Sequence, residues 1–329
     1  MPAARKPFLS PATYRKDIKR TPTRNGYGDG VVEAAKTNEN IVVLCCDLTE
    51  STRSAAFKKA YPDRFIQMGI AEQSMAAIAG GLALEGKVPF ISSYAAFNPG
   101  RNFDQIRMAA AMQNVPVMIM GAHAGISVGP DGGTHQMLED VAMMRALPNM
   151  TVISPCDYLE AKRAIIECSK MKSPVYVRFG RSATPSFTTK RTPFKIGRAE
   201  TFKEGTDVAI IATGPLVHEA LMAARELEKQ KISAMVINVH TIKPLDKKAI
   251  VAAAKKCGAV VTVEEAQCSG GLGGAVAECL SKNLPTPMRL VAVHDRFGES
   301  GDPEELMKHF QLDRKEIVSQ VNDVLKLKA

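Results

Sequence analysis

Short apolar runs of strand length alternate with helix-length amphipathic segments along most of this chain, and this alternation limits the folds open to it. The clearest run is IVVLCC at residues 41–46. It has no polar position on either face, which indicates a strand buried on both sides of a sheet. Strands that alternate with helices are typical of βαβ units, which build parallel sheets covered by helices. The sequence therefore predicts an α/β fold with doubly wound, mostly parallel sheets.

Two blocks of this alternation are separated by a segment of different composition. Residues 182–202 are rich in Thr, Pro and charged side chains, which indicates a linker. In the first block we expect strands at residues 41–46, 88–92, 115–120, 151–154 and 175–178, and helices at residues 72–84, 102–113, 136–145 and 158–170, the last with Asp157 as its N-cap. In the second block we expect strands at residues 208–212, 233–239 and 259–263, and helices at residues 217–230 and 247–256. Two domains follow, at residues 1–187 and 188–329.

The composition excludes several classes of protein. Hydrophobic residues make up 45% of the 329 residues, and no apolar run reaches the length of about 18 residues that a membrane span needs. The net charge is +9, but Lys and Arg are dispersed and only 5% of residues are aromatic, so we expect an anionic small substrate and no nucleic acid. The seven cysteines form no CxxC pair, which favours a reducing, cytoplasmic setting with the thiols packed as small hydrophobes.

Glu72 is the one charged residue in FIQMGIAEQSMAAIAGGLAL, residues 65–84. It stands at the start of a helix made otherwise of small, apolar and uncharged residues, so that helix should be buried. A carboxylate in this position is either a first-turn residue stabilised by the helix dipole or a functional acid that holds and passes a proton. Taken alone, the segment leaves both interpretations open.

A glycine-rich stretch at residues 121–136, GAHAGISVGPDGGTHQ, carries His123, Asp131 and His135. Functional residues concentrate in such loops, and a histidine near neutral pH can donate, accept or shuttle a proton. The alternative is a solvated surface loop. A second glycine run, GGLGG at residues 270–274, opens a predicted helix, so its amides are candidates for an anion site; close packing of helix on strand explains it equally well.

The motifs GIAEQ, ISSYAAF and DGGTHQ together resemble the transketolase family, and VINVHTIKPLD and VVTVEEAQCSGGLGG extend the resemblance to the second block. The resemblance implies a pyrimidine-binding domain at residues 1–187, a transketolase C-terminal domain at residues 188–329, and thiamine diphosphate as cofactor. In that family the Glu of GIAEQ hydrogen-bonds N1′ of the aminopyrimidine, a role that falls here on Glu72. Tyr94 and Phe97 would pack against that ring, and Asp47 would border the cofactor. After Phe97 the sequence NPGRNFDQIR carries an insertion relative to familiar transketolases.

The resemblance also implies a sugar-phosphate site. Its residues would be Arg24, Ser51, His123, Asp131, His135 and Arg181. His135 is expected to act on protons at the reacting hydroxyls, whereas arginines suit a phosphate because their contacts are charge-assisted and bidentate. Arg178 competes with Arg181 for the second arginine position, and the register favours Arg181.

The family's diphosphate-binding half has no counterpart in this chain. GYGDG at residues 26–30 contains the GDG triplet with which the Mg²⁺-diphosphate motif begins, but the region that should complete it with an Asn reads SAAFKKAYPDRF. Because Mg²⁺ needs several hard oxygen ligands, we expect a loop leading into a helix there and no metal ligands in this chain. The resemblance therefore implies a separate N-terminal transketolase subunit that holds the diphosphate and Mg²⁺, in an α2β2 heterotetramer built on a homodimer of this chain.

The expected reaction is transfer of a two-carbon ketol unit from a ketose phosphate to an aldose phosphate, as in the pentose phosphate pathway. Two related enzymes compete with this interpretation. 1-Deoxyxylulose-5-phosphate synthase shares the THQ loop but is normally one long chain and lacks a His at the position of His123. The beta subunits of 2-oxoacid dehydrogenases also need a partner, but their loops do not match DGGTHQ. A noncatalytic subunit that only binds a partner is the alternative outside enzymes.

Overall fold

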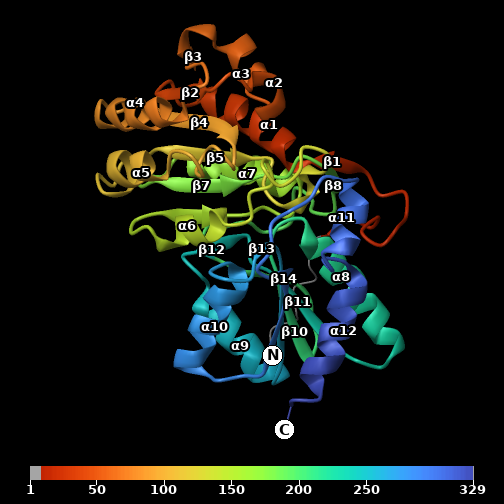
Figure 1. Ribbon diagram of the computed structural model, residues 1–329. Coiled ribbons are helices and arrows are strands. Elements are labelled where there is room, and N and C mark those ends of the chain that lie inside the picture. Colours follow the sequence, from red (N-terminus) through yellow and green to blue (C-terminus); the bar gives the residue numbers. More distant parts are fainter. Residues whose placement is uncertain (1–8, 329) are drawn as a thin grey trace.

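The computed structural model describes residues 9–328. In it the chain folds into two large sheets, each covered by helices on both faces (Figure 1). The sheet in the upper half of Figure 1 has seven strands and the sheet below it has five. Most neighbouring strands are parallel, which confirms the predicted α/β fold. Every helix in this described part of the chain is too short or too polar to cross a lipid bilayer.

The seven-stranded sheet is built almost entirely from the first half of the sequence. Its strands, in spatial order, are β12 (Thr241–Lys243), β6 (Thr151–Ile153), β7 (Val175–Arg178), β5 (Met118–Ala122), β4 (Val88–Tyr94), β2 (Ile41–Cys45) and β3 (Phe65–Gln67). A separate antiparallel pair joins β1 (Arg20–Pro22) to β8 (Ala183–Pro185). All contacts in the large sheet are parallel except that of β12 with β6.

Helices cover both faces of this sheet because successive strand residues point to opposite sides. On β4, Phe90 packs with the core under α1 (Thr23–Ala35), α3 (Ala55–Ala60) and α7 (Tyr158–Cys168). The next residue, Ile91, packs with the core under α4 (Glu72–Leu84), α5 (Phe103–Ile106), η2 (Arg107–Ala111) and α6 (Asp140–Ala146). Short helical turns lie at α2 (Thr49–Thr52), η1 (Pro62–Arg64) and η3 (Ile126–Val128). The helix expected at residues 72–84 is thus observed.

The five-stranded sheet is built in the same way from the second half of the sequence. Its order is β14 (Met288–Val293), β13 (Val260–Gln267), β10 (Val208–Ala212), β11 (Ala234–Asn238) and β9 (Glu200–Lys203), the last antiparallel to its neighbour. One face is covered by α8 (Leu216–Lys229) and α12 (Arg314–Leu325), and the other by α9 (Lys247–Cys257) and α10 (Leu272–Asn283). The helix α11 (Pro303–His309) lies near η3 of the first half.

The two halves share structure that the sequence did not predict. β12 follows β11 in the chain yet pairs with β6 of the large sheet, and one hydrophobic core runs from α4 and α6 to α9 and α10. The segment expected to be a linker begins in β8 and ends in β9, so only its middle is irregular. Asp157 caps α7 as predicted, because its side chain accepts from Glu160 N at 3.0 Å, and it also accepts from the amides of Phe187 and Thr188.

Three local predictions need correction. GYGDG is not a loop, because residues 26–30 lie inside α1. A Cβ at Gly26 would stand 2.5 Å from Tyr158 O, and one at Gly30 would stand 2.9 Å from Ile165 Cβ, so these glycines let α1 pack closely on α7. The strand expected at residues 115–120 starts at Met118. The helix expected from residue 136 starts at Asp140, because Met137 O accepts from Gly125 N and holds the preceding chain extended.

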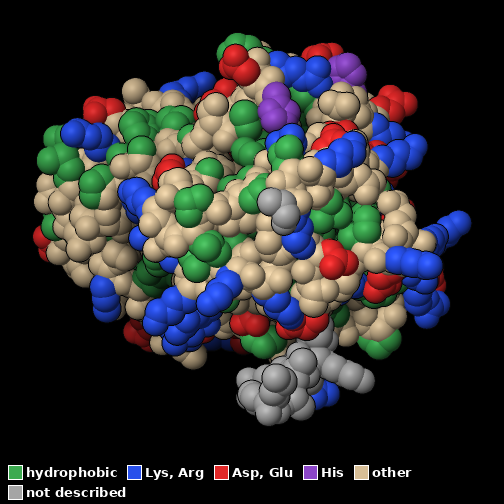
Figure 2. Space-filling view, turned by 90° about the horizontal axis from the view of Figure 1, so that it is seen from below, with side chains coloured by type: hydrophobic (Ala, Val, Ile, Leu, Met, Phe, Trp, Pro, Cys, Tyr) green, Lys and Arg blue, Asp and Glu red, His purple; other side chains and the backbone are tan. Residues whose placement is uncertain are grey.

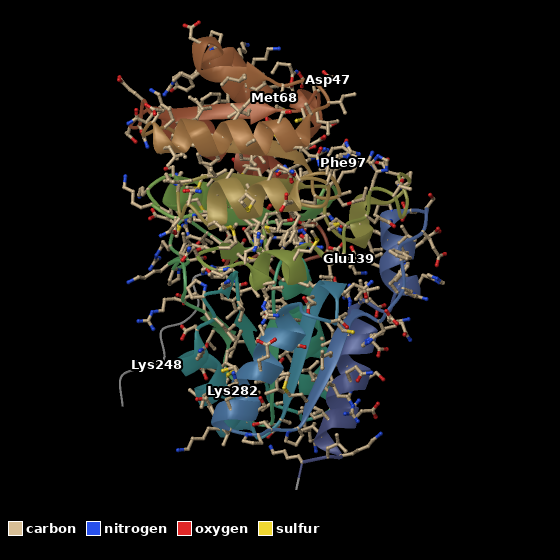
Figure 3. All side chains as sticks on the ribbon, turned by 60° about the vertical axis from the view of Figure 1, so that its left-hand side comes forward. Asp47, Met68, Phe97, Glu139, Lys248 and Lys282 are labelled. Carbon is tan, nitrogen blue, oxygen red and sulfur yellow. The ribbon has the colours of Figure 1, made fainter. Side chains whose placement is uncertain are left out.

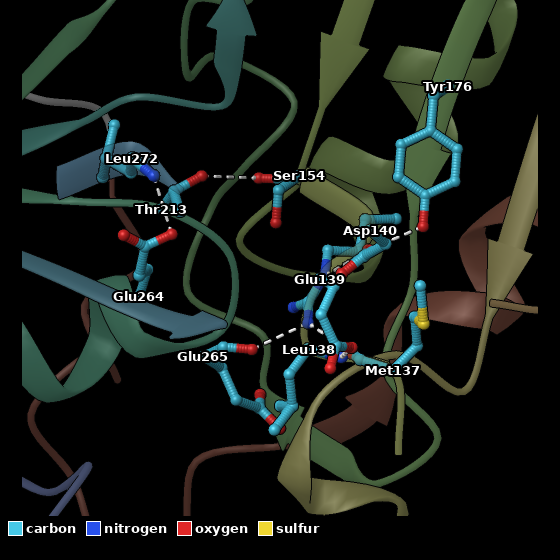
Figure 4. A network of polar contacts seen from close by, with 12 residues as sticks. Met137, Leu138, Glu139, Asp140, Ser154, Tyr176, Thr213, Glu264, Glu265 and Leu272 are labelled. Carbon is cyan, nitrogen blue, oxygen red and sulfur yellow. Dashed lines mark hydrogen bonds and ion pairs between the residues drawn. The ribbon is translucent and has the colours of Figure 1, made fainter. Parts of the chain in front are cut away.

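The amides at GGLGG bind a carboxyl group of the protein itself. Glu264, on β13, accepts from Leu272 N at 2.7 Å (Figure 4). It also accepts from Gly273 N at 2.8 Å. A Cβ at Gly271 would meet the same carboxylate at 2.2 Å. Burial raises the pKa of Glu264 to about 7, against the lowering effect of these two amides. The start of α10 is therefore satisfied from within and is not available to a ligand.

Candidate active site

The predicted site residues collect where β2, β4, β5 and β7 end. The strands β2 and β4 are neighbours, and the chain leaves β2 toward β3 but leaves β4 toward β5, in the opposite direction. Open α/β sheets bind ligands at the carboxyl ends of strands beside such a switch. Ser51 follows β2, Tyr94 ends β4, His123 follows β5 and Arg181 follows β7. Asp47 and Phe97 mark this edge of the large sheet in Figure 3.

Glu72 lies at the N-terminus of α4 and is 2% exposed. Each of its carboxylate oxygens has a partner. Ser93 Oγ donates to Oε1 at 3.0 Å, and Arg101 Nη1 donates to Oε2 at 3.1 Å. Neither Ser93 nor Arg101 was predicted from the sequence. The signal for Arg101 was a cation in the NPGR stretch, directly after the predicted ring Phe97.

Tyr94 and Phe97 form one aromatic group with both histidines of the glycine-rich loop. The two rings are stacked with centroids 6.1 Å apart, and His123 stacks on Tyr94 at 3.8 Å. His135 meets Tyr94 and Phe97 edge-on, at 6.0 and 5.6 Å. Thr134 Oγ1 lies 2.9 Å from His135 Nδ1. The loop that the sequence indicated is therefore folded over the aromatic pair and is not a free surface loop.

His123 is held as a neutral histidine. Arg24 Nη1 lies 3.1 Å from His123 Nε2, and because a guanidinium can only donate, Nε2 must accept and the proton must sit on Nδ1. Nδ1 is buried without a hydrogen-bond partner in the described residues. Burial, together with the charges of Arg24 and Arg181, lowers the pKa of His123 to about 3. The residue also has a positive φ of 56°, a conformation that is uncommon outside glycine.

A group of arginines surrounds this histidine. Arg24 Nη1 also donates to Ser51 O at 2.9 Å, and Arg181 donates to Val128 O at 2.8 Å with Asp131 Oδ1 at 3.7 Å. Arg53, which the sequence analysis missed, bonds Asn25 Oδ1 at 2.9 Å. Burial and then the charge of Arg53 lower the pKa of Arg24. This end of the site is therefore cationic and suits an anion.

Arg178 and Asp47 lie apart from these groups. Arg178 is buried, donates from Nε to Asp140 Oδ2 at 2.8 Å and from Nη2 to Glu265 O at 2.7 Å, and so links the two halves. Asp47 is exposed, and its recorded hydrogen bond runs from its backbone N–H to Gln67 Oε1. Arg181 is therefore the arginine available to a ligand, whereas Arg178 holds the two halves of the chain together.

The residues fit the pyrimidine end of a thiamine cofactor. A buried carboxylate beside two half-buried aromatic rings suits a planar nitrogen heterocycle. Across residues 9–328 there is no group of three His, Cys, Asp or Glu side chains that could hold a metal ion. Basic side chains on the face shown in Figure 2 lie in separate groups among acidic ones.

Comparisons with known proteins bear on both halves of the chain. Residues 19–186 match the model of the transketolase pyrimidine-binding domain, and residues 197–317 match that of the transketolase C-terminal domain. A putative transketolase C-terminal section from Methanocaldococcus jannaschii is 43% identical over 92% of this chain and 96% of its own length. A 6-deoxy-6-sulfo-D-fructose transketolase subunit from a Clostridium species is 42% identical over 93% of this chain and 95% of its own. A solved structure described as a split gene transketolase, an inactive beta4 tetramer, is 40% identical with a TM-score of 0.86, and the match covers 94% of this chain and 99% of the other.

Proposed function

Because the chain belongs to the transketolase family, we propose that it is the C-terminal subunit of a two-chain transketolase that transfers a two-carbon ketol unit from a ketose phosphate to an aldose phosphate. The observation that carries this proposal is the convergence of Glu72, the Tyr94–Phe97 pair and the two loop histidines at one sheet edge. We assign residues 1–187 to the pyrimidine-binding domain and residues 188–329 to the C-terminal domain.

Thiamine diphosphate, when bound, would supply a carbanion that adds to the ketose carbonyl. The residues of this chain would prepare the site for that chemistry. Glu72 would hold the aminopyrimidine nitrogen N1′, while Tyr94 and Phe97 would fix the plane of the ring. The buried surroundings of Glu72 exclude water from this contact. Asp47, exposed at the strand end, would lie at the border of the cofactor.

The substrate would extend from the aromatic pair toward the arginines. His135, at the edge of both rings, would take and return protons at the reacting hydroxyls, with Asp131 on a further hydroxyl. Arg24, Arg181, Ser51 and the Nδ1–H of His123 would bind the phosphate. The absence of a carboxylate ion pair to Arg24 among the described residues leaves its charge available to a substrate anion.

The partner would be an N-terminal transketolase subunit that holds the diphosphate and Mg²⁺. This chain has an apolar surface beside Glu72 that a partner would cover. The surface, here called the α4 face, consists of Ile70, Ile78, Leu84, Met108 and Met112, with Ile70 79% exposed and Leu84 63% exposed. The elements α4 and η2 contact each other, and exposed apolar residues on neighbouring elements are typical of interaction sites. We propose an α2β2 assembly with two copies of this chain, working in the cytoplasm.

The proposal is tested by mixing this chain with the candidate N-terminal subunit, thiamine diphosphate and Mg²⁺, and measuring ketol transfer from xylulose 5-phosphate to ribose 5-phosphate. We expect transfer in the mixture and none with either chain alone. A complex that is silent with sugar phosphates but decarboxylates pyruvate would instead support a synthase-like or 2-oxoacid dehydrogenase-like activity. A complex without either activity would indicate a noncatalytic subunit.

A further inference from the structure

Arg101 makes, with its own guanidinium, the set of contacts that the proposed cofactor ring would need. Its Nη1 donates to Glu72 Oε2 at 3.1 Å, and its guanidinium carbon lies 4.4 Å from the centre of the Phe97 ring. The other oxygen of Glu72 is already bonded to Ser93 Oγ at 3.0 Å. A planar cation therefore lies over one proposed stacking ring and bonds the remaining oxygen of the proposed catalytic acid.

We propose that the guanidinium of Arg101 takes the place of the aminopyrimidine in the resting protein. It bonds Glu72 there and must leave before thiamine diphosphate can bind. This inference rests on the proposed function, because it takes Glu72 and Phe97 to be the pyrimidine contacts. It assigns to Arg101 the part of a positioning residue, which acts through Glu72 and does not touch the reacting atoms of a substrate.

The chemistry of the two groups explains why one can replace the other. A guanidinium is flat and delocalised, presents N–H groups along its edge and stacks on aromatic faces. An aminopyrimidine is also flat, carries nitrogen along its edge and stacks on aromatic rings. Both therefore satisfy a carboxylate with the edge and an aromatic ring with the face. A lysine ammonium would keep the charge of Arg101 but could not form the flat stack.

The surroundings of Arg101 allow its side chain to leave without disturbing the fold. The backbone around it is fixed by two buried amides, since Asn98 Nδ2 donates to Ile91 O and Met120 O, and Asn102 Nδ2 donates to Glu72 O. The side chain of Arg101, by contrast, is 47% exposed, and Glu72 is its ion-pair partner. The guanidinium can therefore move out to water, while Glu72 keeps its hydrogen bond from Ser93 and the incoming cofactor ring takes the vacated oxygen.

Arg101 and the proposed stacking ring Phe97 belong to one turn of the chain. Arg101 is the last residue of the NPGR stretch that directly follows Phe97. Arg101 N also donates to Phe97 O at 3.3 Å, so the turn that carries Phe97 carries Arg101 back over that ring. This turn thus delivers the guanidinium to the proposed cofactor pocket.

The test measures the dissociation constant of thiamine diphosphate, at fixed Mg²⁺, from the complex of this chain with its N-terminal subunit by titration calorimetry. Arg101→Met keeps an apolar stem over Phe97 and removes the guanidinium. We expect it to bind the cofactor about fivefold more tightly than the natural protein, with Arg101→Lys between the two. The matched control is Arg107→Met, an exposed arginine in η2 whose recorded side-chain bond is to Met108 Sδ, and it should leave the constant unchanged.

A competition experiment separates a true stand-in from a general effect of the substitution. Free methylguanidinium should restore competition in an Arg101→Ala complex, raising the apparent dissociation constant of thiamine diphosphate there but not in the natural complex. Equal or weaker cofactor binding by Arg101→Met, or the same response to methylguanidinium in both complexes, would overturn the inference. These measurements need no turnover, so a complex that binds the cofactor as expected but transfers no ketol unit would refute the proposed function alone.

Discussion

Arg24 and His123 share one hydrogen bond, with Arg24 Nη1 3.1 Å from His123 Nε2, and this contact fixes the state of the histidine. A cation on one ring nitrogen disfavours a second positive charge, and burial acts in the same direction. The unpartnered Nδ1–H is then a neutral donor within a group of arginines. The arginines thus supply the positive charge of this end of the site, and His123 supplies an uncharged N–H donor in a fixed orientation.

The first prediction concerns pH. Because the pKa of His123 is lowered to about 3, first by burial and then by Arg24, its proton stays on Nδ1 alone from pH 5 to pH 9. In the two-chain complex, the KM for a phosphorylated acceptor should therefore show no transition from His123 near pH 6.5. His123→Gln should raise this KM by roughly tenfold, the cost of one hydrogen bond to a charged group, without altering the shape of the pH profile. A transition near pH 6.5 that disappears in His123→Gln would show that the histidine titrates during the reaction.

The second prediction concerns the charge of the substrate. Arg181→Ala should raise KM for phosphorylated acceptors more than it slows any step at the cofactor, because Arg181 lies at the anion end with Arg24. Arg53→Leu should act in the same direction, since the charge of Arg53 contributes to lowering the pKa of both Arg24 and His123. The control is an acceptor without phosphate, for which both variants should match the natural protein. An equal loss with the phosphate-free acceptor would count against this assignment.

A related measurement uses the sulfonate group named for the Clostridium relative. Three arginines favour a dianion over a monoanion by simple Coulomb attraction, so we expect the natural complex to prefer a phosphorylated over a sulfonated ketose. Arg53→Leu should narrow that preference. If the complex prefers the sulfonated sugar, this chain would share the substrate named for that relative, and the assignment to phosphorylated sugars would be wrong.

The third prediction concerns the buried ion pair of Arg178, the residue that also bonds Glu265 of the second half. Arg178 and Asp140 are 6% and 0% exposed and 2.8 Å apart, and Tyr176 Oη also donates to Asp140 at 2.6 Å. Removing one member leaves an uncompensated buried charge, so Arg178→Met should lower the free energy of unfolding by about 3–5 kcal/mol in urea titrations. The surface pair Lys170–Glu167 is the control, and Lys170→Met should change stability by less than about 1 kcal/mol. Similar losses for the two variants would contradict the assigned burial.

The fourth prediction concerns the partner. Ile78→Glu places a charge on the α4 face, within the helix that begins with Glu72, so it should weaken binding of the N-terminal subunit by at least tenfold in sedimentation or surface-binding measurements. Leu327→Glu is the control, since Leu327 is exposed at the far end of the chain. Unchanged assembly of the Ile78 variant would place the partner on another surface.

The sequence predicted those features that depend on neighbouring residues. The strand at residues 41–46 is recognisable because it is apolar on both faces, and the helix at residues 72–84 because its small residues begin with one carboxylate. Asp157 was identifiable as a cap because it precedes an amphipathic helix directly. Glu72, Tyr94, Phe97, His123 and His135 were indicated by family resemblance, and the structure brings them together.

The features that the sequence did not predict depend on contacts between distant residues. TIK at residues 241–243 resembles a loop exit, and nothing local indicates that it pairs with β6. The glycines of GYGDG look like a loop until α7 is present to pack against them. Glu264 was passed over because its two amide partners arise only when α10 begins beside β13. Arg101 reaches Glu72 across 29 residues of sequence, a relation that only the folded chain reveals.

The most direct test of the account replaces Glu72 by Gln in the complete two-chain mixture and measures ketol transfer from xylulose 5-phosphate to ribose 5-phosphate, with complex formation followed in parallel. Glutamine keeps the size of the side chain and can still accept from Ser93, but it has no carboxyl group to exchange a proton. We expect the variant to assemble with the N-terminal subunit as the natural chain does and to lose transfer by a factor of about one hundred or more. Full activity in an assembled Glu72→Gln complex would contradict the claim that this chain supplies the catalytic acid.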